Sequence, residues 1–221
     1  DIDLPFDNAV WEIIYNTASK NNIKFLLTGA NASTEGYLPP AFTHYKLDSL
    51  NLKYIYKKFG NSNLAKFPIV GPIKIKYYKY IRGIETYSPL NWIKYEKNEA
   101  KTLMANELGW RDYGNKHYEN IFTRFYQGYI LIEKFKVDKR KPQLSSLIAS
   151  GQLTREEVLR ILTAEKPYTD EKLLISDRDF FSKKMGMAEQ ELNDYIKAPS
   201  VPHTDYPSWM NVYKKLRPLK R

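Results

Sequence analysis

The chain contains no cysteine, so disulfides, thiolate metal sites and a cysteine nucleophile are all excluded within it. Its three histidines, His44, His117 and His203, stand too far apart for a short metal-binding motif. No metal-ligating residue is therefore predicted. Any metal that takes part is expected to be a hard ion that prefers oxygen ligands and arrives with a nucleotide.

Long hydrophobic runs are also missing. No stretch approaches the ~20 uninterrupted apolar residues that a membrane helix needs, and the N-terminus lacks the charged and then apolar pattern of a signal peptide. With 43% hydrophobic residues, the chain can still build a sizeable core. We therefore expect a soluble protein without membrane insertion, most simply a cytoplasmic one.

Two common catalytic motifs are absent as well, since neither Gly-x-Ser-x-Gly nor the P-loop pattern Gly-x4-Gly-Lys-Ser/Thr occurs. Positive charge, in contrast, is in excess, with a formal net charge of +10. A basic surface attracts nucleic acid, anionic membranes or phosphorylated small molecules. Because the lysines are spread along the chain, the charge does not favour any one of these partners. The alternative, that the basic residues simply form a solvated surface, therefore also fits.

The first half of the chain alternates helical and strand patterns. Asp7 can cap a helix, because apolar residues recur at helical spacing over 10–18. A short, mostly apolar run at 23–28 predicts a buried strand, 84–90 predicts a second strand, and 95–108 predicts a helix that follows it. This order is typical of α/β folds.

After Gly109 the pattern becomes helical, beginning with an apolar stripe from 118 to 132. We therefore predict an α/β domain over residues 1–108 and an all-helical region over residues 109–221. Two strands alone do not make a stable parallel sheet, because such sheets have more strands and are covered on both faces. Since the sequence also opens on Asp1 rather than methionine, further strands are expected upstream.

The first candidate site is the polar loop after the first strand. Ligands of open α/β sheets bind at the carboxyl ends of strands, and this loop offers glycine, amide, hydroxyl and carboxylate groups at Thr28, Gly29, Asn31, Thr34 and Glu35. The glutamate could hold magnesium through water or bind a ribose. A surface turn with a helix cap is the alternative, and spacing alone favours that alternative.

The second candidate site lies between Gly109 and Phe125, where ionisable residues of several types crowd together. The two arginines, Arg111 and Arg124, could clamp phosphates through paired donors, and His117 could transfer a proton near neutral pH. The alternative is a solvated helix start. The two interpretations are evenly balanced.

Two further segments are basic. Lys139 and Arg140 precede a helix predicted at 144–149, whose N-terminus could bind an anion, although a solvated charge run is the commoner explanation. Basic and aromatic residues interleave over 74–80, as they do on nucleic-acid surfaces, but ordinary helix packing explains this pattern equally. Farther on, Thr154 and Glu157 predict a capping box.

These clusters resemble a known family. The segment from Gly109 to Glu157 reads GWRDYGNKHYENIFTRFYQGYILIEKFKVDKRKPQLSSLIASGQLTREE, and it is similar to the N-acetyl sugar amidotransferases of surface-polysaccharide biosynthesis, the WbpG type. NNIKFLLTGANASTE, from Asn21 to Glu35, and the ending Tyr206-Pro207-Ser208-Trp209 are similar too. The likeness covers essentially the whole chain.

The resemblance implies a fold. The family belongs to the PP-loop ATP pyrophosphatases, so we expect the C-terminal part of an adenine-nucleotide α-hydrolase-like parallel-sheet domain followed by an all-helical region. The Ser-Gly-Gly-x-Asp-Ser loop that grips ATP phosphates in such proteins is absent from this sequence, and so is a cysteine zinc segment. The chain departs from the family pattern at Asn8, Ala30 and Asn115.

The resemblance also implies roles for the residues. Thr28, Gly29, Asn31, Thr34 and Glu35 would line the ATP crevice. Catalysis would fall to Lys116, His117 and Glu119. Arg111, Arg124, Lys139 and Arg140 would bind the substrate or its phosphates. The expected cofactors are ATP and Mg²⁺, and no residue of this chain is assigned to a protein-bound metal.

The implied reaction converts a sugar acetamido group to an acetamidino group with ammonia derived from glutamine. Partners would be a glutaminase subunit and a cyclase-like subunit similar to those of histidine biosynthesis, together with a nucleotide-linked N-acetyl sugar. Nucleic acid is not an expected partner of this reaction. The alternatives are a PP-loop enzyme that modifies tRNA, which the positive charge would suit, and an inactive module that binds a partner protein.

Overall fold

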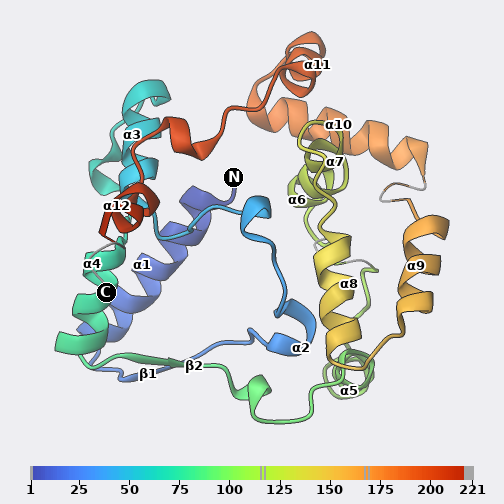
Figure 1. Cartoon of the computed structure of the whole chain (residues 1–221), viewed down its shortest axis with the longest axis horizontal. Coiled ribbons are helices and arrows are strands. Elements are labelled where there is room, and N and C mark those ends of the chain that lie inside the picture. The colour runs from blue at the N-terminus through green and yellow to red at the C-terminus, as the bar shows by residue number, and fades with distance from the viewer. Residues whose placement is uncertain (1, 115, 117, 167, 169, 217–221) are drawn as a thin grey trace. The chain divides into compact units, whose positions relative to one another are not determined.

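The computed structural model describes residues 2–114, 116, 118–166, 168 and 170–216. The chain is mostly helical and contains one small sheet of two parallel strands (Figure 1). An α/β fold is compatible with this content. Among the described residues, no helix combines the length and the apolar character that crossing a membrane requires.

The chain divides into two compact units, each assembled from segments that are discontinuous in sequence. Unit 1 comprises residues 1–29, 43–89 and 201–221, and unit 2 comprises residues 30–42 and 90–200. The predicted boundary after residue 108 refers to a parent α/β domain and stays a prediction.

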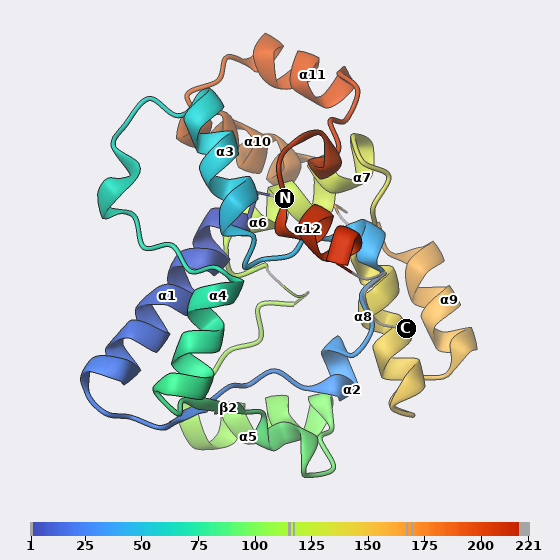
Figure 2. The ribbon, with the colours of Figure 1, turned by 60° about the vertical axis from the view of Figure 1, so that its left-hand side comes forward.

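Unit 1 contains four main helices, a π-helical turn and both strands. They are α1 (Leu4–Lys20), β1 (Phe25–Leu27), α3 (Ser49–Phe59), η2 (Leu64–Lys66), α4 (Pro72–Lys76), the π turn η3 (Tyr77–Ile81), β2 (Glu85–Tyr87), η6 (His203–Asp205) and α12 (Trp209–Leu216). Helices α1 and α4 lie side by side in Figures 1 and 2. The short turn η4 (Pro89–Asn91) lies where the sequence passes into unit 2.

The first helix begins earlier than predicted. Its N-cap is Asp3, and Pro5 occupies the first turn, where a missing backbone N–H costs nothing. Asp7, the predicted cap, lies inside the first turn instead. A carboxylate there still stabilises the helix, because it faces the positive end of the helix dipole.

Both predicted strands form, but each is only three residues long. They pair in parallel, with Phe25 opposite Glu85 and Leu27 opposite Tyr87. Leu26 packs against the core of unit 1, whereas Phe25 and Leu27 on the other face are 65% and 74% exposed. On β1, therefore, Leu26 faces the core, whereas Phe25 and Leu27 are open to solvent.

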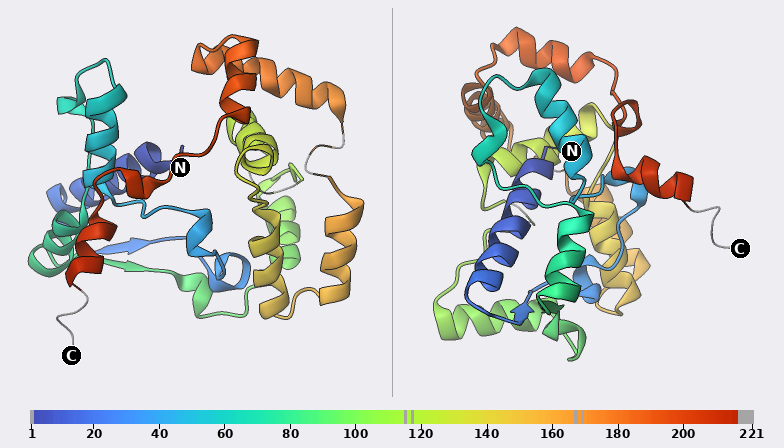
Figure 3. Two further views of the ribbon diagram at one scale, coloured as in Figure 1. Left: turned by 45° about the horizontal axis from the view of Figure 1, so that its top comes forward. Right: turned by 90° about the vertical axis from the view of Figure 1, so that its left-hand side faces the viewer.

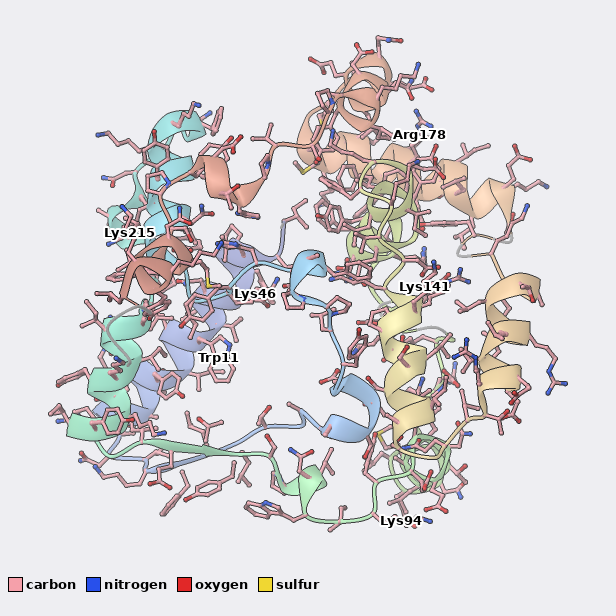
Figure 4. The ribbon with its side chains drawn as sticks, viewed as in Figure 1. Trp11, Lys46, Lys94, Lys141, Arg178 and Lys215 are labelled. Carbon is pink, nitrogen blue, oxygen red and sulfur yellow. The ribbon has the colours of Figure 1, made fainter. Side chains whose placement is uncertain are left out.

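The core of unit 1 joins α1 to η3 and the strand that follows. Tyr15 and Tyr78 stack with their ring centroids 5.3 Å apart, and Trp11 on α1 packs against the same cluster (Figure 4). Asn8 is fully buried and clamps one residue of the chain, because it accepts a hydrogen bond from the backbone N–H of Val70 at 2.8 Å and donates to its carbonyl at 2.7 Å. These two bonds give Asn8 a structural role.

The C-terminal segment is fastened to α3 through one buried carboxylate. Asp48 accepts hydrogen bonds from the hydroxyl of Ser208 at 2.5 Å and from the backbone N–H of Trp209 at 3.1 Å. The rings of His44 and His203 stack with centroids 4.0 Å apart, and His44 Nε2 lies 2.9 Å from Asp48. This buried polar network therefore holds the tail to the start of α3.

Unit 2 is helical throughout, and its described residues contain no strand. Its elements are α2 (Ala32–Glu35), η1 (Pro40–Phe42), α5 (Lys97–Leu108), α6 (Ile121–Phe125), the π turn η5 (Tyr126–Ile130), α7 (Leu131–Glu133), α8 (Arg140–Ala149), α9 (Arg155–Ala164), α10 (Glu171–Met185) and α11 (Glu189–Lys197). Helices α8 and α9 run beside each other (Figure 3).

The apolar stripe predicted at 118–132 forms one helix that a π turn interrupts. The backbone N–H of Leu131 bonds to the carbonyl of Tyr126, five residues back. On one side of this helix, Phe125 is fully buried and packs against Phe181 of α10, with ring centroids 5.1 Å apart. The contact between α6 and α10 is the core of unit 2.

Local signals account for most helix ends in unit 2. Helix α5 stops at Gly109, whose φ of +62° glycine adopts at less cost than residues with a side chain. The predicted capping box of Thr154 and Glu157 is present at the start of α9. The helix predicted at 144–149 begins earlier, at Arg140, so that Lys139 is its N-cap residue.

Candidate functional site

A cavity of about 370 Å³ lies within unit 2. Its walls come from α2, the segment before α6, the π turn η5, and the start of α8. Ligand pockets of small molecules have volumes of about 300–1,000 Å³, so this cavity could hold part of a sugar nucleotide or another small ligand. Six predicted site residues line it: Thr34, Glu35, Lys116, Arg124, Lys139 and Arg140.

The polar loop contributes one wall as a capped helical turn. Asn31 accepts hydrogen bonds from the backbone N–H of Thr34 at 2.9 Å and from its hydroxyl at 3.0 Å. The hydroxyl of Ser150 donates to the carbonyl of Ser33 at 3.0 Å, which fastens this turn to the end of α8. The local structure is thus the turn with a helix cap that was the alternative to a ligand-binding loop. The same turn nevertheless places Thr34 and Glu35 in the cavity lining.

Arg124 lines the cavity and forms an ion pair with Asp177. Its Nε and Nη2 donate to the two carboxylate oxygens of Asp177 at 2.6 and 2.7 Å, and its Nη1 donates to the carbonyl of Tyr118 at 3.0 Å. The hydrogen bond with Asp177 raises the pKa of Arg124 above its ordinary value. Each of the three guanidinium nitrogens therefore already donates a hydrogen bond to a protein group.

Asp177 is 1% exposed and belongs to α10. The hydroxyl of Tyr168 also donates to it at 2.8 Å. Burial, and then this hydrogen bond, raise the pKa of Tyr168 well above its ordinary value, so its proton stays in place. In this structure Arg124 joins α10 to Tyr118, and Tyr118 is itself part of the cavity wall.

Arg140 is paired in the same manner. Its Nη2 and Nε donate to Asp138 at 2.7 and 3.1 Å, and its Nη1 donates to the carbonyl of Glu165. Burial alone would raise the pKa of Asp138, but the hydrogen bonds from the Arg140 side chain and backbone outweigh it and lower that pKa. This second arginine therefore ties α8 to the end of α9.

Lys116 and Glu35 form an ion pair across the cavity, although 81 residues separate them in sequence. The family resemblance assigns Lys116 to catalysis and Glu35 to the ATP crevice. Their side chains are 38% and 41% exposed. Ion pairs this exposed contribute about 0–1 kcal/mol to stability, so an incoming ligand can separate them easily.

Other predicted residues lie elsewhere. Thr28 and Gly29 belong to unit 1, at the end of β1, where the Thr28 backbone N–H donates to the carbonyl of Tyr87 at 2.9 Å. Arg111 is exposed and is not among the residues that line the cavity. Glu119 lines a separate hollow with Phe180 and Lys184. His117 and the departure at Asn115 lie outside the described residues.

Sequence reasoning missed the carboxamides of this cavity. Gln127 and Gly128 line it from the π turn, and Gln143 lines it from α8. The stripe from 118 to 132 was interpreted by its apolar members alone. A glutamine and a glycine together inside such a stripe are the signal that could have identified this wall.

The side chains of the cavity can be compared with the ligands that a metal ion requires. Among the described residues, no three histidine or acidic side chains gather as a protein-bound metal site would require. A nucleotide-bound Mg²⁺ needs fewer protein ligands, and Glu35 with Thr34 offers oxygen atoms of the type it prefers. These residues would hold Mg²⁺–ATP at the α2 wall, and Lys116 would face its phosphates.

One comparison identifies the family. Residues 119–219 match the family model described as LPS biosynthesis protein WbpG-like, C-terminal domain. The predicted resemblance to the WbpG type is thus confirmed over residues 119–219, a match that includes Arg124, Lys139 and Arg140 of the cavity. Comparisons with curated proteins and with solved structures gave no match.

The WbpG-like segment contributes to both units, because residues 119–200 lie in unit 2 and the rest lie in unit 1. It contains the helix interrupted by the π turn and the tail that Asp48 fastens. A WbpG-like C-terminal domain indicates a function connected with lipopolysaccharide biosynthesis.

Proposed function

We propose that this WbpG-like protein is an ATP-dependent amidotransferase that converts the acetamido group of a nucleotide-linked sugar to an acetamidino group. One observation supports this most strongly. The cavity brings residues of the polar loop, Thr34 and Glu35, to the basic residues Lys116 and Lys139. The family resemblance assigns the two loop residues to ATP, Lys116 to catalysis and Lys139 to the substrate.

ATP would supply the adenylyl group. Its transfer to the amide oxygen would release pyrophosphate and make that oxygen a good leaving group, so that ammonia could then replace it as AMP departs. The protein's own contribution would be positioning and charge stabilisation. Lys116, released from Glu35, would neutralise negative charge on the phosphates. Arg124, held by Asp177, would keep the Tyr118 wall in place.

The test is AMP release from ATP in the presence of ammonium and a panel of nucleotide-linked N-acetyl sugars, with product detection by mass spectrometry. The protein is used as its gene encodes it. We expect Lys116→Ala to lower turnover at least tenfold, because a positioned charge at a phosphate contributes more than ~1.4 kcal/mol to the barrier.

The matched control is Lys141→Ala. Lys141 is an exposed lysine at the start of α8 (Figure 4), and it is not among the residues that line the cavity. Its loss should leave turnover unchanged. Equal losses in both variants, or no sugar-dependent AMP at all, would refute the proposal.

The ammonia source is part of the proposal. The chain has no cysteine, the usual nucleophile of a glutaminase, so a separate glutaminase subunit with its cyclase-like companion would supply ammonia from glutamine. Adding these two subunits should make AMP release depend on glutamine without added ammonium. Glutamine-dependent turnover by the chain alone would contradict this expectation.

The tRNA alternative has one structural observation in its favour. Tyr77 and Tyr80 in η3 are 46% and 70% exposed, so aromatic rings and neighbouring lysines share a surface as nucleic-acid binding requires. However, Tyr78 belongs to the core, and Lys74 pairs with Glu12. Salt-dependent tRNA binding, lost in Tyr80→Ala and unaffected by sugar, would favour this alternative.

A further inference from the structure

The charged side chains that line the cavity are largely neutralised by partners. Lys116 pairs with Glu35, and Arg140 pairs with Asp138. Arg124 pairs through two bonds with the buried Asp177. An anion entering the cavity would have to displace carboxylates that already bind these cations, and for Arg124 it would leave a buried carboxylate without its partner.

Besides neutral hydroxyl groups, the lining contains the carboxamides of Gln127 and Gln143. Within the part of the chain that the structure describes, no hydrogen bond joins either carboxamide to another protein group. Each carboxamide offers two donors and one acceptor oxygen, so together they match a ligand group that both donates and accepts.

The position of Gln127 depends on the π turn. Tyr126 and Ile130, at the two ends of the turn, are 6% and 1% exposed and anchor it in the core. Between these anchors, the consecutive residues Gln127 and Gly128 both line the cavity. π turns inside α-helices are often found at functional sites, because the extra residue changes which side chains face a given side.

We propose that Gln127 determines specificity in this cavity by binding a neutral amide or hydroxyl group of the sugar, with Gln143 of α8 as a second contact. The inference rests on the proposed function for the identity of the ligand. It adds that the cavity holds the uncharged ring and its acetamido group, while the phosphates lie toward Lys116 and Glu35. A site built to form hydrogen bonds with a ligand group discriminates against an analogue that lacks it.

Binding of free N-acetylglucosamine and of glucose, each titrated by NMR, tests the proposal without ATP or a partner. These sugars differ by an acetamido group in place of a hydroxyl. We expect the wild type to prefer N-acetylglucosamine, and Gln127→Leu to reduce that preference about tenfold, as the loss of one or two hydrogen bonds in a partly buried site predicts. Inorganic phosphate should not displace the sugar.

The matched control is Gln190→Leu on α11, because the Gln190 side chain is exposed and bonds only to Asp194 at 2.9 Å among the described residues. It should keep the wild-type preference. If Gln127→Leu lowers the melting temperature markedly, Gln127→Glu replaces it, since this change keeps the size of the side chain and removes its donors. An unchanged preference in folded variants, or displacement of the sugar by phosphate, would overturn the inference.

The two proposals fail separately. If the wild type releases AMP with a nucleotide-linked sugar but Gln127→Leu retains full sugar preference, then the role of Gln127 is wrong and the amidotransferase stands. If no sugar supports AMP release but Gln127→Leu still loses N-acetylglucosamine binding, the cavity binds the neutral sugar and the reaction is different.

Discussion

Both units bury an aspartate, but the two carboxylates have different surroundings. Asp48 in unit 1 is fully buried and accepts bonds from a hydroxyl, an imidazole and two backbone N–H groups. Asp177 in unit 2 binds an arginine and a tyrosine hydroxyl. The residues that bind Asp48 do not line the cavity, whereas Arg124, which binds Asp177, does. A buried polar network indicates a functional site when one of its members faces a space that a ligand can enter.

The largest effect is expected for Asp177→Asn. Removing this charge leaves the Arg124 guanidinium, which is 15% exposed, without its counter-ion, and breaking a buried pair in this way costs about 3–5 kcal/mol. Urea unfolding followed by circular dichroism would measure the loss.

Asp179→Asn on the same helix is the control. Asp179 is exposed, so its replacement should change stability by less than about 0.5 kcal/mol. If the two variants were equally stable, the Arg124–Asp177 pair would contribute nothing to the free energy of unfolding.

A smaller loss is expected for Asp48→Asn. The amide keeps the shape of the side chain but weakens the bonds from Ser208 and Trp209, and bonds to a charged group contribute about 1.5–3 kcal/mol. We expect unit 1 to lose about 2–3 kcal/mol and the tail to become sensitive to protease. Asp205→Asn, an exposed change in the same tail, should have no such effect, and protease resistance in Asp48→Asn would contradict the role of the clamp.

The stacked histidines predict a pH dependence that is specific to unit 1. Burial foremost lowers the pKa of His203 to about 4, below its ordinary 6.5. The unfolded chain therefore binds this proton more readily than the folded chain between these pH values, and stability falls as the pH drops from 6.5 toward 4.

Because His203 is only partly buried, we expect a loss on the order of 1 kcal/mol between pH 7 and pH 5. Melting temperatures at both pH values, compared with those of His203→Gln, would measure it. The variant should lose most of this dependence, and an identical slope in both proteins would assign the effect to another group.

The smallest stability change is expected for Glu35→Gln. This carboxylate is 41% exposed and its pair with Lys116 is open to water, so stability should change by less than about 0.5–1 kcal/mol. Turnover should nevertheless change, because Lys116 is then free to bind any anion at the cavity mouth. A large stability loss without a change in turnover would show that the Lys116–Glu35 pair has a structural role, as the Asp48 network does.

Features that depend on short sequence patterns could be predicted. The two strands, the end of α5 at Gly109 and the capping box at Thr154 each follow from residues within a few positions of one another. The early start of α1 was missed, because Asp3 and Asp7 are equally good caps by residue type.

The candidate site could be predicted only in part, because its residues are joined by tertiary contacts. Nothing near Arg124 indicates that its partner lies 53 residues later, and nothing near Glu35 indicates Lys116. The π turn was missed for a related reason. Tyr126 and Ile130 at its two ends are buried, and burial is a tertiary property that a local pattern does not report.

The bond between Ser208 and Asp48 joins residues that lie 160 positions apart. A ribosome that adds about 5–20 residues per second needs roughly 8–32 s to cover that distance. During this time α3 has emerged, but the segment that satisfies its buried carboxylate has not yet been made. Unit 2 has all of its segments by residue 200, so it can finish folding first. Unit 1 begins earlier on the ribosome and is completed last.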